Sequence, residues 1–344
     1  MPKYTFPKTF LWGAATSAHQ VEGGNHNQWS IWELENAHSF AQQAKYRLNG
    51  LENWHEIERE ATNPHNYVSG RASDHYRRYE EDFDLLKKMN MNAFRFSIEW
   101  SRIEPEEGLW NEHEIEHYRQ YLLALKKRNI TPVVTLFHWT MPVWFAQKGG
   151  FEKRRNIKYF LRFAEKIFTE LGDHFRIVCT FNEPEVYVAF GWLHEGEWPP
   201  GRKGEFLLGY YTYRNIAIAH NRVVKLARTY KHSFKLGTTK NIANHYSGDT
   251  KLKTWLFMWF TMYMEDYLYL NHTRRHTDWI GVNYYFSNRY INARPANAND
   301  YLHDLARAIK PDDSKFVLQR IYKKHKTPII ITENGVADRN DRYR

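Results

Sequence analysis

The segment Thr327-Pro-Ile-Ile-Ile-Thr-Glu-Asn-Gly335 is an apolar run that becomes polar only in its last residues. A second segment, Arg176-Ile-Val-Cys-Thr-Phe-Asn-Glu-Pro184, has the same pattern and also has a glutamate beside an asparagine near its end, in the opposite order. Short apolar runs without polar alternation are typical of strands that are covered on both faces, as in parallel sheets. The two segments therefore predict two buried parallel strands with polar groups at their carboxyl ends.

Five further runs of this kind bring the number of predicted strands to seven. The predicted strands cover residues 10–18, 92–100, 130–139, 176–184, 234–246, 277–286 and 327–335. The segments between them have helical periodicity, and the predicted helices cover residues 74–89, 111–128, 154–171, 206–230, 251–270 and 312–325. Such alternation predicts parallel strands joined by helical crossovers.

Polar side chains gather at the carboxyl ends of successive predicted strands. A barrel brings all such ends to one mouth, whereas an open sheet spreads them along a line. We therefore predict an α/β fold of the (β/α)8 TIM-barrel type, incomplete because only seven strands can be identified. A single barrel domain is expected over residues 1–344, because barrels of this type commonly reach about 250 residues or more.

Two segments receive separate predictions. Residues 36–71 are polar and aperiodic, so we expect a long loop over the barrel mouth. The most apolar stretch, residues 255–264, is too short to cross a bilayer and is followed directly by Glu265 and Asp266. A buried helix is the structure that this stretch predicts.

Composition excludes several classes of protein. The net charge of +10 is spread along the chain outside residues 153–155 and 323–326, so no nucleic-acid partner is expected. The single cysteine, Cys179, excludes an internal disulfide and any multi-cysteine metal centre, and it indicates a reducing compartment. The first residues lack the apolar core of a signal peptide. We therefore expect a cytoplasmic protein without a membrane partner.

Glu183 and Glu333 stand at the carboxyl ends of two predicted strands. Cleavage of a glycosidic bond uses two carboxyl groups that face one pocket, one as acid and base and the other as nucleophile or water activator. Arg95, in the run 92–100, is a positive partner that can keep one of them ionised. The alternative is a pair of unrelated surface glutamates, with Arg95 in a structural ion pair.

A zinc-binding pattern also occurs in the sequence. His113-Glu-Ile-Glu-His117 matches H-E-x-x-H, in which two histidines bind zinc and the glutamate acts as a base. Its flanks place it in the polar first turn of the predicted helix 111–128, where acidic residues favour the helix dipole. We therefore expect a solvated helix start and no metal site, and no organic cofactor is implied.

Six motifs follow one another along the chain. They are Phe10-Leu-Trp-Gly-Ala-Ala-Thr-Ser-Ala-His-Gln-Val-Glu-Gly-Gly24, Phe94-Arg-Phe-Ser-Ile-Glu-Trp-Ser-Arg-Ile103, Leu136-Phe-His-Trp139, Thr180-Phe-Asn-Glu-Pro184, Gly281-Val-Asn-Tyr-Tyr285 and Ile331-Thr-Glu-Asn-Gly335. In this order they resemble glycoside hydrolase family 1, the β-glucosidase and β-galactosidase family of (β/α)8 barrels. The resemblance extends over nearly the whole chain.

The resemblance implies a role for each matching residue. Glu183 is expected to be the acid/base and Glu333 the nucleophile of a retaining mechanism, with Arg95 and Tyr285 beside the nucleophile. The residues expected to bind the sugar are Gln20, His138, Trp139, Asn182, Asn283 and Tyr285. The implied substrate is a small β-glycoside or an oligosaccharide.

The sequence departs from the family pattern near its end. Nine residues follow Gly335, and none is a tryptophan, whereas the family's eighth strand carries a Trp- and Glu-containing segment that holds the outer hydroxyls of the sugar. We expect an open barrel edge, closed by a second subunit in a homo-oligomer, by residues 338–344 or by mobile loops. Loss of these sugar contacts predicts weak and broad glycosidase activity. A catalytically impaired barrel that binds a sugar or another ligand is the alternative function.

Overall fold

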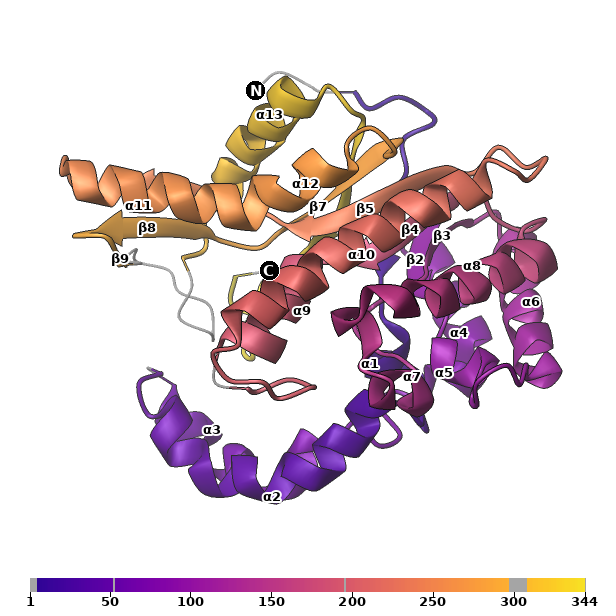
Figure 1. Ribbon diagram of the computed structural model, residues 1–344, viewed down its shortest axis with the longest axis horizontal. Coiled ribbons are helices and arrows are strands. Elements are labelled where there is room, and N and C mark those ends of the chain that lie inside the picture. The colour runs from indigo at the N-terminus through magenta and orange to yellow at the C-terminus, as the bar shows by residue number, and fades with distance from the viewer. Residues whose placement is uncertain (1–4, 52, 195, 297–307, 344) are drawn as a thin grey trace.

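The computed structural model describes residues 5–51, 53–194, 196–296 and 308–343, and its main element is a parallel sheet of seven strands (Figure 1). The strands follow the order β1 (Gly13–Ala15), β2 (Ala93–Ser97), β3 (Thr131–Thr135), β4 (Ile177–Asn182), β5 (Lys235–Asn241), β7 (Trp279–Tyr284) and β10 (Ile329–Asn334). All neighbouring strands are parallel. Each strand lies within one of the seven predicted runs, so the predicted strands are confirmed.

The sheet curls into a nearly closed barrel. Its end strands, β1 and β10, approach each other to within 8 Å between Cα atoms, but neither is hydrogen-bonded to the other in the described residues. On β10, the side chain of Ile331 is 54% exposed. The prediction of an incomplete barrel of the TIM type is therefore confirmed for the described part of the chain.

Helices cover the outside of the barrel. The longer ones are α4 (His75–Lys88), α6 (Glu112–Lys127), α8 (Ile157–Leu171), α10 (Phe206–Ala227) and α13 (Ser314–His325). Shorter ones are α1 (Ala18–Val21), α5 (Trp100–Ile103), α7 (Val143–Gln147), η2 (Gly150–Glu152), η3 (Arg154–Asn156), α9 (Pro184–Val188), η4 (Ala189–Leu193), α12 (Leu268–Thr273) and η6 (Pro311–Asp313).

Helix α8 shows why these segments fold against the sheet. Phe160, Phe163, Ala164, Ile167 and Leu171 recur at intervals of three and four residues, and all five are fully buried. Such spacing places them on one helical face. Burial of each large side chain stabilises the fold by about 1.5–3 kcal/mol, and truncation of Phe163 to alanine is expected to cost about 3–5 kcal/mol.

A second, smaller sheet lies beside the barrel. It contains β6 (Asn244–Ser247), β8 (Ser287–Ile291) and β9 (Arg294–Pro295), with β6 parallel to β8 and β8 antiparallel to β9. The predicted strand 234–246 is thus divided between the two sheets. Helix α11 (Leu252–Met262) packs on this small sheet and continues through a π-helical turn, η5 (Tyr263–Tyr267).

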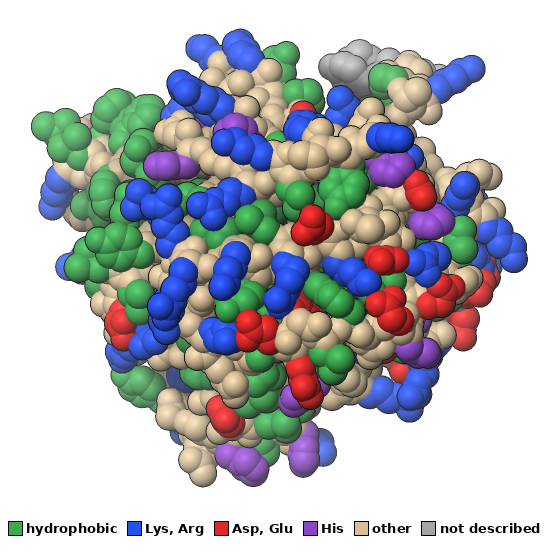
Figure 2. Space-filling model, turned by 45° about the vertical axis from the view of Figure 1, so that its right-hand side comes forward, with side chains coloured by type: hydrophobic (Ala, Val, Ile, Leu, Met, Phe, Trp, Pro, Cys, Tyr) green, Lys and Arg blue, Asp and Glu red, His purple; other side chains and the backbone are tan. Residues whose placement is uncertain are grey.

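The prediction that residues 255–264 form a buried helix is only half right. The helix forms, but only one side is covered, through Thr254, Met258 and Met262. The other side carries exposed apolar residues such as Phe260, at 63% exposure, because α11 packs on a single layer. Hydrophobic side chains are gathered at the upper left of Figure 2, where Figure 1 places α11. Within the described ranges, no helix is long and apolar enough to cross a membrane.

The prediction of a long loop over residues 36–71 is wrong. The segment is largely helical and contains most of α2 (Gln28–Leu48), all of α3 (Trp54–Ala61) and the short η1 (Pro64–Tyr67). Asn27 and Ser30 form a reciprocal capping box at the start of α2. The buried stripe of α2 consists of small residues, Ala37, Ala41 and Ala44, so the sequence shows no strong apolar period. Alanine favours helix even without that period.

Candidate active site

Glu183 and Glu333 lie at the carboxyl ends of β4 and β10, as the sequence predicts. Strand pairing shifts register just before each of them, between Cys179 and Asn182 in β4 and between Ile331 and Glu333 in β10. Register shifts of this kind change the direction in which the following side chains point. The two glutamates are thus positioned by irregularities in the strands that carry them.

Glu333 is held by a cation and a phenol. Arg95 Nη1 donates to its Oε1 at 2.5 Å, and the Tyr285 hydroxyl donates to its Oε2 at 2.5 Å. Burial raises the pKa of this carboxyl, but the charge of Arg95 and the two hydrogen bonds outweigh burial and hold the pKa below its ordinary value. Glu333 is therefore ionised at neutral pH.

Glu183 has the opposite environment. It is 4% exposed, and burial, followed by the negative charges of Glu333 and Glu185, raises its pKa to about 8. Asn283 Nδ2 donates to its Oε1 at 2.7 Å. Its backbone has a φ of 41°, in the left-handed region that costs a non-glycine residue about 1–3 kcal/mol. Glu183 is therefore a strained, protonated carboxyl group at neutral pH.

Asn283 connects the two glutamates. Its amide reaches Glu183, and its backbone pairs in register with Glu333 on the neighbouring strand. The hydroxyl of Thr332 donates to Asn283 Oδ1 at 2.6 Å, which fixes the amide with its nitrogen toward Glu183. The acid and the carboxylate therefore share one rigid neighbour.

His138 and Asn182 form the adjoining part of the site. Arg95 Nη2 donates to Asn182 Oδ1 at 2.5 Å, so the amide nitrogen of Asn182 faces His138 Nε2, 3.0 Å away. That nitrogen of the histidine then accepts, which leaves the proton on Nδ1. Burial and the nearby Arg95 lower the pKa of His138 to about 3, so the ring is neutral. Nδ1 is buried and has no partner in the described residues.

Trp139 closes this side of the site with an aromatic wall. Its indole nitrogen donates to the Asn182 carbonyl at 3.1 Å, and its own φ is 74°. Trp29 and Trp198 pack against its ring, with centroids 6.2 and 4.6 Å away. Apolar ring faces beside polar groups are suited to sugars, which have both apolar faces and hydroxyl edges.

Gln20 is the predicted site residue that the described contacts do not join to the others. It belongs to α1, which follows β1, and its side chain is exposed and accepts from Ser17 Oγ at 2.6 Å. The structure therefore places Gln20 at the end of the first strand, outside the hydrogen-bonded network around the glutamates.

A buried ion pair that the sequence did not lead us to expect lies next to the site. Lys240 Nζ on β5 lies 2.5 Å from Glu185 Oε2 and also donates to the Tyr213 hydroxyl at 2.9 Å. Lys240 is completely buried, and burial raises the pKa of Glu185 to about 7. The available signal was a charged residue two positions after Glu183 and another inside the apolar run 234–246.

The H-E-x-x-H pattern has a structural use. His117 stacks on Tyr76 with ring centroids 3.8 Å apart, and Glu114 accepts hydrogen bonds from the Tyr76 hydroxyl. The side chain of His113 is 84% exposed. In the part of the chain that the structure describes, no three histidine, cysteine or acidic side chains are grouped as metal ligands.

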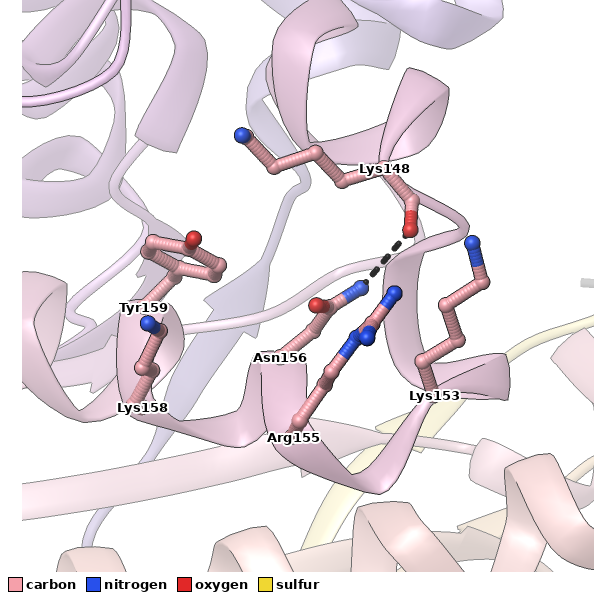
Figure 3. A pocket seen from close by; sticks show the side chains of 6 residues that line it. All are labelled: Lys148, Lys153, Arg155, Asn156, Lys158 and Tyr159. Carbon is pink, nitrogen blue, oxygen red and sulfur yellow. Dashed lines mark hydrogen bonds between the residues drawn. The ribbon is translucent and has the colours of Figure 1, made fainter.

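A separate surface hollow lies between α7 and α8 (Figure 3). Its lining consists of Lys148, Lys153, Arg155, Asn156, Lys158 and Tyr159. Asn156 is satisfied locally, since its amide donates to the Lys148 and Gly150 carbonyls at 3.0 Å each. The hollow contains no carboxyl group, so it cannot provide the acid and base that Glu183 and Glu333 offer.

Comparison with known proteins agrees with this geometry. The model of Glycosyl hydrolase family 1 matches residues 2–256. Beta-glucosidase A of Acetivibrio thermocellus is 33% identical over 259 residues, which cover 73% of this chain and 52% of the relative. Beta-glucosidase A of Thermotoga maritima is 28% identical over 371 residues, covering 96% of this chain and 78% of the relative.

A solved structure with the same fold is the beta-glycosidase from Pyrococcus horikoshii. It superposes with a TM-score of 0.83 at 30% identity, over 98% of this chain and 78% of that one. The chain therefore spans about half the length of the Acetivibrio relative and about four fifths of the Pyrococcus structure. Because the family model matches well over half of the residues, the chain belongs to glycosyl hydrolase family 1.

Proposed function

We propose that the chain is a retaining β-glycosidase that hydrolyses β-glucosides or related β-glycosides. The observation that carries this proposal is the contrast between the two carboxyl groups: Glu333 accepts hydrogen bonds from Arg95 and Tyr285, which lower its pKa, whereas Glu183 is buried at 4% exposure, which raises its pKa. A glycosidase needs one carboxylic acid and one carboxylate at the same bond. The glucosidase and glycosidase relatives support the substrate class.

In the first step, Glu333 attacks the anomeric carbon and forms a covalent glycosyl ester. The bond to the leaving oxygen breaks, and that oxygen takes the proton from Glu183. Retention requires the carboxyl groups about 5–5.5 Å apart. The shared neighbour Asn283, bonded to one glutamate and in register with the other, supports such a separation.

In the second step, Glu183 is a carboxylate and acts as a base. It takes a proton from water, the water oxygen attacks the anomeric carbon, and the ester bond to Glu333 breaks. Loss of the proton from Glu183 is easiest while Glu333 is esterified and carries no charge, because the two carboxylates repel each other. The two steps thus return each group to its starting state.

The neighbouring side chains would bind the sugar in the same site. His138 Nδ1 would donate to a hydroxyl, Trp139 would cover an apolar ring face, and Asn182 would contact the hydroxyl next to the anomeric carbon. Gln20, Asn283 and Tyr285 complete the proposed substrate-binding set. Interactions that strengthen as positive charge develops on the ring lower the barrier.

The proposal is tested by trapping the intermediate. A 2-deoxy-2-fluoro-β-glucoside with a dinitrophenolate leaving group should label Glu333, and peptide mass analysis should find the adduct there. Hydrolysis of a panel of nitrophenyl β-glycosides should disappear in Glu333→Gln and fall strongly in Glu183→Gln, while the exposed Glu165→Gln on α8 serves as a control. A product of inverted configuration, or no adduct on an active enzyme, would refute a retaining mechanism.

A second candidate function is sugar binding with little or no turnover. It is favoured by the position of Glu333 on β10, which is paired on one side only in the described residues. We propose weak activity for the same reason. Calorimetric binding of a glycoside to a folded wild-type chain that hydrolyses none of the panel would favour this alternative.

We also propose a cytoplasmic enzyme that pairs with a second copy at the open seam. The single cysteine supports a reducing compartment, and unpaired parallel edges favour association. Sedimentation velocity on the 344-residue chain should then show a dimer. A monomer at all concentrations would contradict the pairing.

A further inference from the structure

Helix α11 carries apolar residues on both of its sides. The inner side, with Thr254, Met258 and Met262, packs toward the small sheet. Phe257 meets Tyr290 of β8 edge to face at 5.8 Å, and Thr254 Oγ1 accepts from the Ala293 amide at 3.2 Å. The inner side is therefore sufficient to hold the helix in place.

The outer side of α11 and the start of the π-helical turn η5 together carry seven large apolar side chains that are at least 37% exposed. Residues at i, i+4 and i+8 align along a helix, so they form two rows. One row is Leu252, Leu256, Phe260 and Met264, and the other is Trp255, Trp259 and Tyr263. Helices that are apolar all round are normally covered, and exposed apolar patches of this size on soluble domains mark interaction sites.

The charged side chains on α11 and its N-cap are positive. Within residues 250–264 the only charged residues are Lys251 and Lys253, both exposed, and the acidic Asp249 and Glu265 lie just outside the two ends of this segment. The whole chain has a net charge of +10. In Figure 2, blue Lys and Arg side chains lie beside the hydrophobic side chains at the upper left, and red acidic side chains are concentrated to the right and below.

We propose that α11 docks the protein reversibly on an anionic lipid surface. The helix would lie in the plane of the interface, with the row of Leu252, Leu256, Phe260 and Met264 in the acyl boundary. The row of tryptophans and tyrosine would lie at the headgroups, where such amphipathic rings are enriched. The lysines would contact anionic headgroups.

Charge and composition favour lipid over a second copy of the chain. Two copies docked through α11 would bring Lys251 and Lys253 of both helices together, whereas an anionic membrane attracts these lysines and the net charge of +10 on the chain. Protein interfaces also have a polar rim with about one hydrogen bond per 100–200 Å². The outer face of α11 offers polar atoms only on its tryptophan and tyrosine rings and its flanking lysines.

The experiment measures binding of the full 344-residue chain to vesicles by co-sedimentation. Vesicles of phosphatidylcholine with one third phosphatidylglycerol should bind the protein, and vesicles of phosphatidylcholine alone should bind it more weakly. Added salt should weaken the first and have little effect on the second, because salt screens the charges and leaves apolar burial.

Two variants test the helix itself. Trp259→Ser combined with Phe260→Ser should weaken partition into anionic vesicles by about a hundredfold, since two large side chains no longer leave water. The matched control, Leu85→Ser with Met89→Ser, changes two similarly exposed apolar residues in and just after α4 and should leave binding unchanged. Lys251→Gln with Lys253→Gln should weaken binding to anionic vesicles by about tenfold or more, without altering the apolar face.

Three results would overturn the proposal. The first is a folded wild-type chain that binds neither kind of vesicle. The second is equal binding by the wild type and the α11 serine variant, which would place the contact elsewhere. The third is a dimer, seen by sedimentation, that the α11 serine variant abolishes, because a second copy would then cover the helix. Unchanged circular dichroism of the variants establishes that each comparison concerns folded protein.

Discussion

Arg95 Nη1 lies 2.5 Å from Glu333 Oε1, across the barrel mouth from β2 to β10. The other terminal nitrogen of the same guanidinium donates to Asn182, and Nε donates to Thr135 at 3.1 Å. One planar group with a fixed fork therefore holds the proposed nucleophile and a proposed sugar ligand in a defined relation.

Replacement of Arg95 is expected to impair the nucleophile in two separable ways. Arg95→Lys keeps the charge but loses the fork, so kcat/KM should fall by roughly 10–150-fold, the value of a hydrogen bond to a charged group. Arg95→Met also removes the charge, so the pKa of Glu333 should rise and the acidic limb of the pH profile should move to higher pH. Arg228→Lys, in a pair with Asp278 at the surface, is the control. An acidic limb that stays in place in Arg95→Met would contradict this account.

The rate should depend on pH in a bell shape. Below the lowered pKa of Glu333 the nucleophile is protonated, and above about pH 8 Glu183 has lost the proton that it must donate. We therefore expect kcat/KM for a poor leaving group, such as a methyl β-glycoside, to be flat near neutral pH and to decline above about pH 8. A dinitrophenolate needs little protonation, so its basic limb in the glycosylation step should be shallow. Identical limbs for both substrates would refute the role of Glu183 as acid.

The raised pKa of Glu183 also predicts a cost in stability. A carboxyl with a folded pKa of about 8 and an unfolded pKa of about 4.3 binds more protons when folded. Stability from this group is complete below about pH 4.3 and is lost as pH rises through about 8. Glu183→Gln cannot ionise, so its melting temperature should exceed that of the wild type at pH 8.5 and approach it at pH 5. An equal difference in melting temperature at the two pH values would contradict the prediction.

Removing one partner of the buried Lys240–Glu185 pair should lower the free energy of unfolding strongly, whereas replacing both partners by apolar residues should lower it much less. Lys240→Met leaves a buried carboxyl without its cation, and we expect a loss of about 3–5 kcal/mol in the free energy of unfolding. Combined with Glu185→Leu, most of this loss should be recovered, because no unpaired charge remains. Denaturant unfolding of the two variants measures both effects. Arg78→Met, in an exposed pair with Glu81, should change the free energy of unfolding little and serves as the control.

Much of the architecture could be predicted from sequence because strands and helices differ in the period of their apolar residues. The run that becomes β10 is unbroken and short, and α8 repeats phenylalanine and isoleucine at helical spacing. Helix α2 was missed because its buried side is made of alanines, which carry little hydrophobic signal. The outer side of α11 was misjudged because apolarity alone does not show how many layers pack on a helix.

The sequence was enough to predict which residues form the candidate site, but not which hydrogen bonds and ion pairs join them. Polar groups at strand ends identify Glu183, Glu333 and Arg95, since the barrel brings those ends together. The sequence does not show that Thr332 fixes the Asn283 amide, because that contact depends on the shifted register in β10. Nor does it show that Lys240 points toward Glu185, because the partners are 55 residues apart and meet only in the fold.

One flank of β10 is unpaired in the described residues, which affects how accurately the proposed nucleophile, Glu333, is placed. A strand bonded on one side only can swing about its single row of hydrogen bonds, and Glu333 sits near its end. The hydrogen bonds from Arg95 and Tyr285 to the Glu333 carboxylate restrain this movement. In this barrel the carboxylate of Glu333 is therefore positioned by the hydrogen bonds from Arg95 and Tyr285 as much as by the backbone of β10.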